Sequence, residues 1–228
     1  TDEYAPISRI SGLKQLSRKS LVHALNLKSV ARRYARELGR NYSELNLITV
    51  QLGGGSSIAV HVGGRMVDSV DANGEGPFSP ERAGGLRADD LAQMILREKM
   101  DFPAVRSLLT RSGGLTSHLG TADARVVEAR IAAGDADAQL VYEAMAYAIA
   151  KQICAFAATV AGKVDGILLT GGLARSAILT GAIAARVGFL GPVRLYPGEF
   201  EMEALRDGVR RVLSGEERPR NYPDGAFL

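Results

Sequence analysis

Two glycine-rich turns are the segments of this sequence best suited to chemistry. Residues 53–55 are Gly-Gly-Gly after an apolar run, and residues 171–172 are Gly-Gly between the run ILLT and a helical pattern. Glycine lets a ligand approach the main chain, and N–H groups at such turns or at a helix N-terminus bind anions. Each turn is therefore a candidate phosphate site, although a purely structural turn is the commoner interpretation of either one taken singly. Neither matches a Walker A loop or the G-x-G-x-x-G fingerprint.

Other residue types that commonly carry chemistry are sparse. His23, His61 and His118 are far apart in the sequence and lack the spacing of metal ligands, which argues against zinc. The single cysteine, Cys154, lies in the apolar segment AYAIAKQICAFAATVAG. Because it has no partner for an internal disulfide, we interpret it as a core thiol.

The elements that position the first turn are predicted from hydrophobic periodicity. Residues 20–38 carry apolar side chains at helical spacing, with Ser20 as a candidate cap and Gly39 just past the end. Three short β-like runs follow, separated by glycine turns, and they predict an antiparallel meander over residues 46–51, 56–62 and 65–69.

The second half of the chain alternates between helical and β-like patterns. Residues 136–160 are mostly alanine and larger apolar residues, which predicts a central buried helix. A buried strand is expected at 166–170, followed by a glycine turn and a helix, then a strand in PVRLYPGE and a helix in EMEALRDGVRRVL. A meander followed by alternating helices and strands indicates a mixed α/β protein.

Bulk composition excludes several classes of function. The 228 residues are 46% hydrophobic and carry a net charge of +3, with arginines scattered rather than interleaved with aromatic residues. We therefore expect no nucleic-acid partner. No apolar run approaches the roughly 20 residues of a membrane span, and no signal peptide opens the chain, so we expect no membrane association and a cytoplasmic location.

A family resemblance rests on several blocks taken together. They are RKSLVHALNLKSVARR, LITVQLGGGSSIAVHVGGRMVD, GEGPFSPERAGGL, GGLTSHLGTADAR, ILLTGGLARS and YPGEFEMEALRDG. In this order they resemble the carboxylate (acetate and butyrate) kinases, more closely the butyrate kinase branch. The resemblance covers nearly the whole chain.

The resemblance implies an α/β fold: an actin-like ATPase (ribonuclease H-like) lobe with a mixed five-stranded sheet flanked by helices. Family members carry an N-terminal lobe, with its own phosphate hairpin and active-site arginine, before the position of Thr1. We therefore expect this chain to correspond to the C-terminal part of a two-lobed enzyme. Residues 1–45 are assigned to an interlobe segment and helix, and residues 46–228 to the C-terminal nucleotide-binding lobe.

The implied reaction is transfer of the γ-phosphoryl group of ATP to butyrate or a similar short-chain acid, giving an acyl phosphate and ADP. An acceptor with a pKa of about 4 to 5 is already ionised at neutral pH, so no catalytic base is needed. The site must instead supply positive charge, hydrogen-bond donors and in-line positioning. The resemblance assigns the catalytic roles to Arg82, His23 and Asp2.

The resemblance also implies how ATP or ADP and Mg²⁺ are held. Main-chain N–H groups of the first turn would reach the β- and γ-phosphates, beside Gln51, where family members commonly have histidine. Glu201 matches the magnesium-associated glutamate best, with Glu199 as the fallback. Acetate kinases have an aromatic residue where Ala124 stands. The nucleotide-binding residues implied are Gln51, Gly53, Gly54, Gly55, Asp123, Ala124, Arg125, Gly171, Gly172, Leu173 and Ser176.

Two alternative functions stay open. In the first alternative, the chain by itself binds a nucleotide but does not catalyse a reaction. In the second, the protein is an actin-like sugar kinase. Sugar kinases need a carboxylate base to activate a hydroxyl group, which distinguishes them from carboxylate kinases. We further expect a homo-oligomer, a dimer or larger, and exposed apolar faces that favour self-association.

Overall fold

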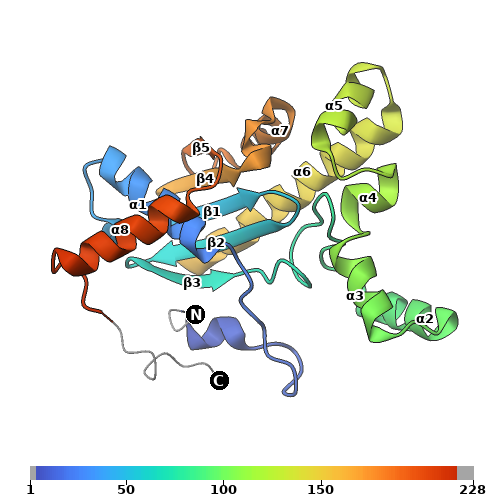
Figure 1. Cartoon of the computed structure of the whole chain (residues 1–228), viewed down its shortest axis with the longest axis horizontal. Helices are drawn as coiled ribbons and strands as arrows, with labels where there is room; N and C mark the ends of the chain where they lie inside the picture. Colours follow the sequence, from blue (N-terminus) through green and yellow to red (C-terminus); the bar gives the residue numbers. More distant parts are fainter. Residues whose placement is uncertain (1–3, 220–228) are drawn as a thin grey trace.

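A mixed five-stranded sheet forms the centre of the computed structural model, which describes residues 4–219 (Figure 1). The strand order is β3-β2-β1-β4-β5. The β1/β2 and β2/β3 pairs are antiparallel, whereas β1/β4 and β4/β5 are parallel. This confirms the expected mixed sheet. The strands are β1 (Leu47–Leu52), β2 (Ser56–Val62), β3 (Arg65–Ser69), β4 (Gly166–Gly171) and β5 (Val193–Pro197).

Helices cover both faces of the sheet, and α2–α5 gather beyond one of its ends (Figure 1). Within residues 4–219 the α-helices are α1 (Ala24–Glu37), α2 (Ala88–Glu98), α3 (Phe102–Thr110), α4 (Gly114–Leu119), α5 (Ala124–Ala132), α6 (Ala136–Ala157), α7 (Ala177–Val187) and α8 (Glu201–Leu213). The 3₁₀ turns in the same part of the chain are η1 (Pro6–Arg9), η2 (Tyr42–Glu44), η3 (Ala158–Val160) and η4 (Gly172–Arg175).

Side-chain alternation along β1 builds the two faces. Ile48 and Val50 point into the main core, which is shared with α6 and α7. Leu47 instead packs with α1 and with Leu168 of β4 on the opposite face. Because successive strand side chains point to opposite faces, a strand covered on both sides needs buried residues throughout. All six residues of β1 are buried.

Helix α6 is the expected central helix. Its apolar side chains form much of the main core, and Cys154 packs against that core from a partly buried position. Burial raises the pKa of the Cys154 thiol above its usual value. The interpretation of Cys154 as a core thiol therefore agrees with its surroundings.

The start of α1 differs from the expectation. The helix begins at Ala24, with His23 in the capping position, rather than at Ser20. The carbonyl group of Leu21 accepts a hydrogen bond from the N–H group of Ala72, at 3.3 Å. This bond ties the segment before α1 to the loop after β3, so residues 20–23 do not extend the helix.

His61 has a structural environment. It is fully buried, and its ring nitrogens lie 2.6 Å from the Tyr42 hydroxyl and 2.8 Å from Oγ1 of Thr49. Burial, with a smaller contribution from Lys28, lowers the pKa of His61 to about 3. The ring is therefore neutral at physiological pH and serves to satisfy its two buried partners.

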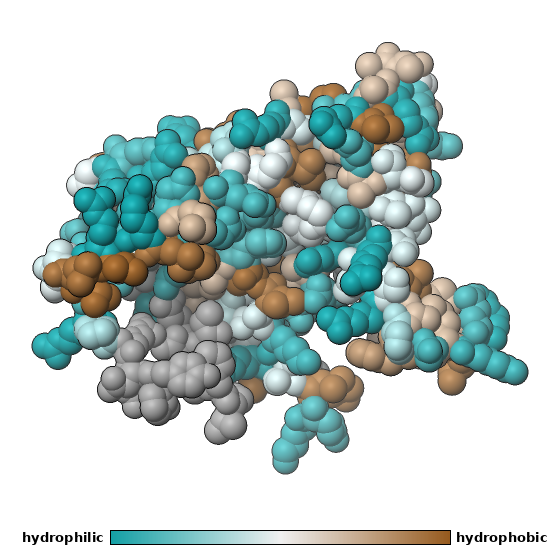
Figure 2. Space-filling view, in the orientation of Figure 1, coloured by the Kyte–Doolittle hydropathy of each residue, from teal (hydrophilic) through white to brown (hydrophobic). Residues whose placement is uncertain are grey.

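The outer side of α8 exposes an apolar band, which Figure 2 shows as a continuous brown strip. Its exposed fractions are Met202 75%, Leu205 50%, Val209 59% and Leu213 81%. The expectation of an exposed apolar face is thus confirmed, while self-association stays a prediction. Among residues 4–219, no helix is long and apolar enough to cross a membrane.

Candidate functional site

Both glycine turns lie at the same end of the sheet. Strands β1 and β4 are parallel neighbours, so the turns that follow them emerge side by side. Gly171 has a φ of +90°, and a Cβ atom there would lie 2.3 Å from the carbonyl oxygen of Leu52. Only glycine permits this approach. The two turns thus lie together at the carboxyl ends of two central strands, where Gly54 and Gly172 are exposed.

Arg82 lies directly against the first glycine turn. A Cβ atom added to Gly55 would meet the Cζ, Nη1 and Nε atoms of Arg82 at 2.5 to 2.7 Å, so the guanidinium group fills the space that a side chain would take. Within residues 4–219, the side chain of Arg82 makes no hydrogen bond or ion pair, while its carbonyl group accepts the N–H group of Ser79 at 3.0 Å. Its donors are therefore available to an anion at the turn.

Hydrogen bonds connect the loop that carries Arg82 to the same turn. The carbonyl group of Gly54 accepts hydrogen bonds from the Ser79 hydroxyl at 2.7 Å and from the N–H group of Glu81 at 3.1 Å. The N–H group of Gly113 in turn donates to the Glu81 carbonyl group at 3.0 Å. These three bonds hold Arg82 beside Gly55, although the two residues are far apart in sequence.

His23 approaches the turn from the α1 side. Its Nδ1 atom lies 3.0 Å from the hydroxyl oxygen of Ser57, which is fully buried in β2. Ser57 pairs with Gln51 across the β1/β2 ladder. The imidazole ring is therefore oriented by a residue that lies two positions beyond the last glycine of the turn.

Asn26 is the centre of a buried polar network behind the turns. This fully buried residue donates from Nδ2 to Oε1 of Gln51 and to Oγ1 of Thr170, the latter at 3.2 Å. Its Oδ1 atom accepts a hydrogen bond from the N–H group of Phe200 at 2.9 Å. One amide side chain of α1 thus joins β1, β4 and the loop before α8.

Gln51 is held at both ends of its amide. Its Oε1 atom accepts from Asn26, and its Nε2 atom donates to Oε1 of Glu199 at 3.2 Å. Only 1% of Gln51 is exposed. The structure therefore places Gln51 as the link between the strand and an exposed carboxylate, rather than as a side chain open to solvent.

The two candidate metal-associated glutamates have different surroundings. Glu199 accepts the hydrogen bond from Gln51, whereas Glu201 lies two residues on, in the first turn of α8. There an acidic side chain also interacts favourably with the helix dipole. Asp2 lies outside the described residues. Among residues 4–219, no group of three or more histidine, cysteine, aspartate or glutamate side chains is arranged to hold a metal ion.

The second glycine turn leads into a well-capped helix. Gly172 is exposed, and a Cβ atom there would meet nothing within 4 Å. Ser176 caps α7 by accepting the N–H group of Leu179 at 3.0 Å, and it also accepts a hydrogen bond from the Tyr142 hydroxyl at 3.2 Å. Leu173 packs against the main core. The open space above Gly172 suits an approaching ligand.

The segment 123–125 forms the start of α5. The Asp123 carboxylate accepts the main-chain N–H group of Arg125 and pairs with its guanidinium group at 2.6 Å. Both bonds come from Arg125, and they lower the pKa of Asp123 to about 2. The Arg125 side chain is 90% exposed, whereas Ala124 is buried in the main core. Arg125 is thus the accessible member of the three.

Tyr142 connects the two segments assigned to adenosine. Its hydroxyl group lies 2.9 Å from Oε1 of Glu128 in α5 and 3.2 Å from Oγ of Ser176. Burial raises the pKa of Tyr142, so the hydroxyl group stays protonated and donates. This residue fixes the spacing of α5 against the start of α7.

Sequence reasoning missed the residues that join these segments. They are Asn26, Ser57, Ser79, Glu128, Tyr142 and Thr170. Neither residue type nor spacing singles most of them out, and their partners in these bonds lie from 14 to 174 positions away in the sequence. Asn26 alone left a signal, as a polar residue within the buried stripe of an amphipathic helix.

The whole arrangement places four kinds of group around one sheet end. They are the exposed main chain at Gly54 and Gly172, a guanidinium group without a partner in the described part of the chain, an imidazole ring and a carboxylate. A sequence model of the acetokinase family matches residues 6–214, which is most of the chain. The chain belongs to the acetokinase family. The site residues of this acetokinase-family chain therefore lie almost entirely inside the matched region.

Relatives and solved structures agree with this membership. The chain is 51% identical over 221 residues to the probable butyrate kinase 2 of Caldanaerobacter subterraneus subsp. tengcongensis, and 45% identical over 222 residues to the butyrate kinase 2 of Clostridium acetobutylicum. Each alignment covers 97% of this chain and 62% of the relative. The chain thus spans about 62% of the length of these relatives.

The fold matches that of an acetate kinase from Porphyromonas gingivalis, with a TM-score of 0.82 at 20% identity. The superposition covers 91% of this chain and 60% of that one. The expected actin-like ATPase fold is therefore confirmed.

Proposed function

We propose that this chain is the nucleotide-holding part of a carboxylate kinase that transfers the γ-phosphoryl group of ATP to butyrate or a similar short-chain acid. The observation that carries the proposal is the Arg82 guanidinium group, without a partner in the described part of the chain and held against Gly55. The identity to relatives named butyrate kinases supports the choice of acid.

Arg82 would bind the charges that meet in this reaction. Its planar fork can hold a carboxylate oxygen and an equatorial phosphoryl oxygen together, which brings two anions into contact. The three hydrogen bonds that anchor its loop to the Gly54 and Gly113 segments position this fork before the substrates arrive. Because the acceptor is already ionised, no residue has to remove a proton.

His23 would donate a hydrogen bond to the transferring phosphoryl group. Ser57 engages its Nδ1 atom, which leaves Nε2 as the ring atom directed elsewhere. Held at the start of α1, the ring can stabilise charge that develops on the phosphoryl oxygens. The N–H groups of Gly54 and Gly55 would contribute further donors to the β- and γ-phosphates. The N–H group of Gly53 instead donates to the Gly55 carbonyl group at 3.2 Å, so it would help to shape the turn.

The chemistry of the donors fits a nucleotide better than an all-protein metal site. An added Cβ atom at Gly55 or Gly171 would collide with Arg82 or with the Leu52 main chain, so these glycines permit close packing of the turns themselves. Gly172 faces open space, which a ligand can enter. Mg²⁺ usually takes one or two carboxylates and completes its shell with phosphates and water. Glu199, which Gln51 orients through a hydrogen bond, would be one such carboxylate, and Glu201 is the other candidate. Bound Mg²⁺ would neutralise phosphate charge.

The adenosine would lie between the start of α5 and the second glycine turn. We assign its contacts to Asp123, Arg125, Gly171, Gly172, Leu173 and Ser176, with buried Ala124 acting through its main chain. Tyr142 supports this assignment, since it ties α5 to Ser176.

The test is calorimetric titration of Mg-ADP into the 228-residue chain. We expect binding by the parent and loss in Gly172→Asp, because the new carboxylate would stand in the path of phosphate or adenosine. Gly181→Asp is the matched control: it is also exposed, in α7, with nothing within 4 Å of its added Cβ atom. It should bind as the parent does.

Hydroxylamine trapping of acyl phosphate from a panel of short carboxylates then identifies the acceptor. Nucleotide binding without acyl phosphate would favour the isolated nucleotide-binding lobe. Equal affinity of the Gly172 and Gly181 variants would refute the placement of the nucleotide at the glycine turns.

A further inference from the structure

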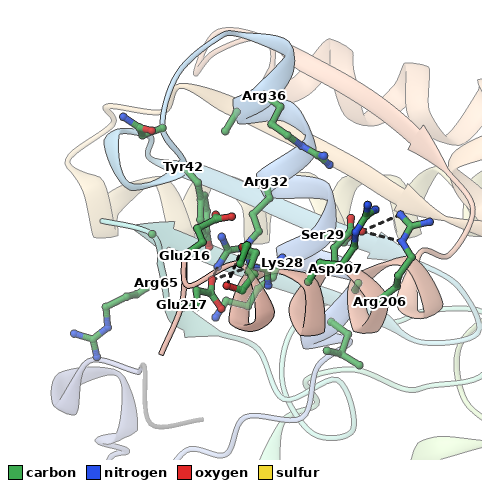
Figure 3. A pocket seen from close by; sticks show the side chains of 18 of the residues that line it. Lys28, Ser29, Arg32, Arg36, Tyr42, Arg65, Arg206, Asp207, Glu216 and Glu217 are labelled. Carbon is green, nitrogen blue, oxygen red and sulfur yellow. Dashed lines mark hydrogen bonds and ion pairs between the residues drawn. The ribbon is translucent and has the colours of Figure 1, made fainter. Parts of the chain in front are cut away.

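A large basic cavity lies alongside α1 and α8 (Figure 3). Its volume is about 1300 Å³, and it opens between α1, α8 and the β2–β3 turn at Gly64. Gly64 follows the carboxyl end of β2, whereas the first glycine turn precedes β2. The lining extends along α1 and α8 as far as Leu25 and Ala204, but it includes none of the residues assigned above to catalysis, the nucleotide or Mg²⁺. The cavity is therefore distinct from the candidate nucleotide site.

The cavity concentrates positive charge far beyond the average of the chain. Nine cationic side chains and three carboxylates line it, a formal net charge of +6, whereas the whole chain carries +3. A recess with walls of one sign focuses its potential on a ligand of the opposite sign. The cationic residues are Lys28, Arg32, Arg36, Arg40, Arg65, Arg206, Arg210, Arg211 and Arg218.

One carboxylate already occupies part of this cavity. The Oε1 atom of Glu217 lies 2.6 Å from Nη2 of Arg32 and 2.9 Å from Nε of Arg211 (Figure 3). Burial opposes its ionisation, but these two arginines outweigh burial and lower the pKa of Glu217. The pair from α1 and α8 is thus spaced to hold an oxyanion, with Glu217 acting as an internal one.

The remaining cations are not neutralised by this carboxylate. The side chains of Arg36, Arg210 and Arg218 make no hydrogen bond or ion pair within residues 4–219. The Nε atom of Arg32 is shielded from solvent and has no hydrogen-bond partner there either. Arg36, Arg210 and Arg218 are exposed, so their donors are open to an anion in solution. The Arg32 Nε atom is the unusual case among the described residues, because a buried donor normally has a partner.

We propose that this cavity binds a small free anion that carries several phosphate groups, and that the anion displaces Glu217 from Arg32 and Arg211. Guanidinium groups bind phosphate through two parallel hydrogen bonds, and a multivalent anion can engage the arginines of α1 and α8 together. The recessed shape favours a compact ligand over the backbone of a nucleic acid. The proposal does not depend on the function of the glycine turns.

The test uses inorganic tripolyphosphate as the probe, titrated into the chain by calorimetry. Arg211→Gln should weaken binding about tenfold or more, because it removes one charge-assisted contact from the cavity. Glu217→Gln should tighten binding, since the internal competitor loses its charge. Arg97→Gln is the control: Arg97 lies on α2, pairs within the described chain with its neighbour Glu98, and should leave the affinity within about twofold.

Circular dichroism checks that each variant is folded. If Arg211→Gln does not fold, Arg36→Gln on the exposed side of α1 takes its place, and weaker binding is again expected. Equal effects of the cavity variants and Arg97→Gln would overturn the proposal, because binding would then lie elsewhere. So would weaker binding by Glu217→Gln, or a single-stranded oligonucleotide that competes with equal affinity.

Discussion

Asn26 offers the sharpest test of how the candidate site is assembled. Replacing it with alanine removes the hydrogen bonds to Gln51, Thr170 and the N–H group of Phe200. Thr170 keeps a partner, because its hydroxyl group also donates to the Gly198 carbonyl group at 3.1 Å. Two groups, Oε1 of Gln51 and the Phe200 N–H, are left without their partner.

The expected cost follows from these two groups. A buried polar group that loses its partner costs about 1–3 kcal/mol, so Asn26→Ala should lower the free energy of unfolding by about 2–4 kcal/mol. The two costs sum to about 2–6 kcal/mol, and we expect the lower part of this range. The nearby Glu199 is exposed, so water can reach the loop and partly replace the lost hydrogen bonds. For a chain of this size, Tm should fall by about 4–16 °C.

The assay is urea unfolding followed by circular dichroism, with Mg-ADP titration as a second measurement. Asn41→Ala is the matched control, since the exposed Asn41 side chain donates to the nearby Glu44 carboxylate, at 2.8 Å. It should cost less than about 0.5 kcal/mol. If Asn26→Ala costs no more than this control, the network does not hold the site together.

A second substitution separates orientation from packing. Asn26→Asp keeps an acceptor for Phe200 but places a carboxylate against Oε1 of Gln51. The Gln51 amide should then rotate, so that its Nε2 atom faces the new carboxylate instead of Glu199. Weaker Mg-ADP binding in a folded Asn26→Asp variant is the expected result, and unchanged affinity would argue against an orienting role.

Three further predictions concern separate parts of the molecule. Gly55→Ala should push the flexible end of the Arg82 side chain aside and lower the free energy of unfolding by less than about 1 kcal/mol. Calorimetric titration should show that it weakens binding of a non-hydrolysable ATP analogue more than binding of ADP. The folded-state pKa of His61 is about 3, below its unfolded value, so its stabilising contribution is complete above about pH 6.5 and is lost as the pH falls. Between pH 7 and 5 this loss is about 2 kcal/mol, and urea unfolding of His61→Gln should depend less steeply on pH. The exposed side chains Met202 and Leu213 should promote self-association, which replacement of both by glutamate reduces in sedimentation experiments.

The strands and the two glycine turns could be predicted from local sequence. An apolar run that ends in consecutive glycines has few alternatives to a buried strand followed by a tight turn, and the observed β1 and β4 follow this pattern. The blocks around these turns also indicated the family, which the match over residues 6–214 confirms. Local chemistry was sufficient because each of these features depends on neighbouring residues.

The placement of side chains across the site depended on the tertiary structure. Gln51 was expected beside phosphate, but its amide is buried between Asn26 and Glu199, and that second partner lies in a loop far along the chain. The start of α1 moved to Ala24 for a similar reason, since the bond between Leu21 and Ala72 crosses to another segment. Long-range hydrogen bonds leave no periodic trace in the sequence.

The sequence by itself thus determined which segments form the sheet, where the main chain is bare and which family the chain resembles. Tertiary structure alone decided that Arg82 lies against Gly55 and that Asn26 joins three elements. The physical reason is that residue propensity and hydrophobic periodicity determine secondary structure over only a few neighbouring residues. The candidate site, in contrast, is brought together by the pairing of parallel strands. The β1/β4 pair brings segments that are distant in the sequence to one edge of the sheet.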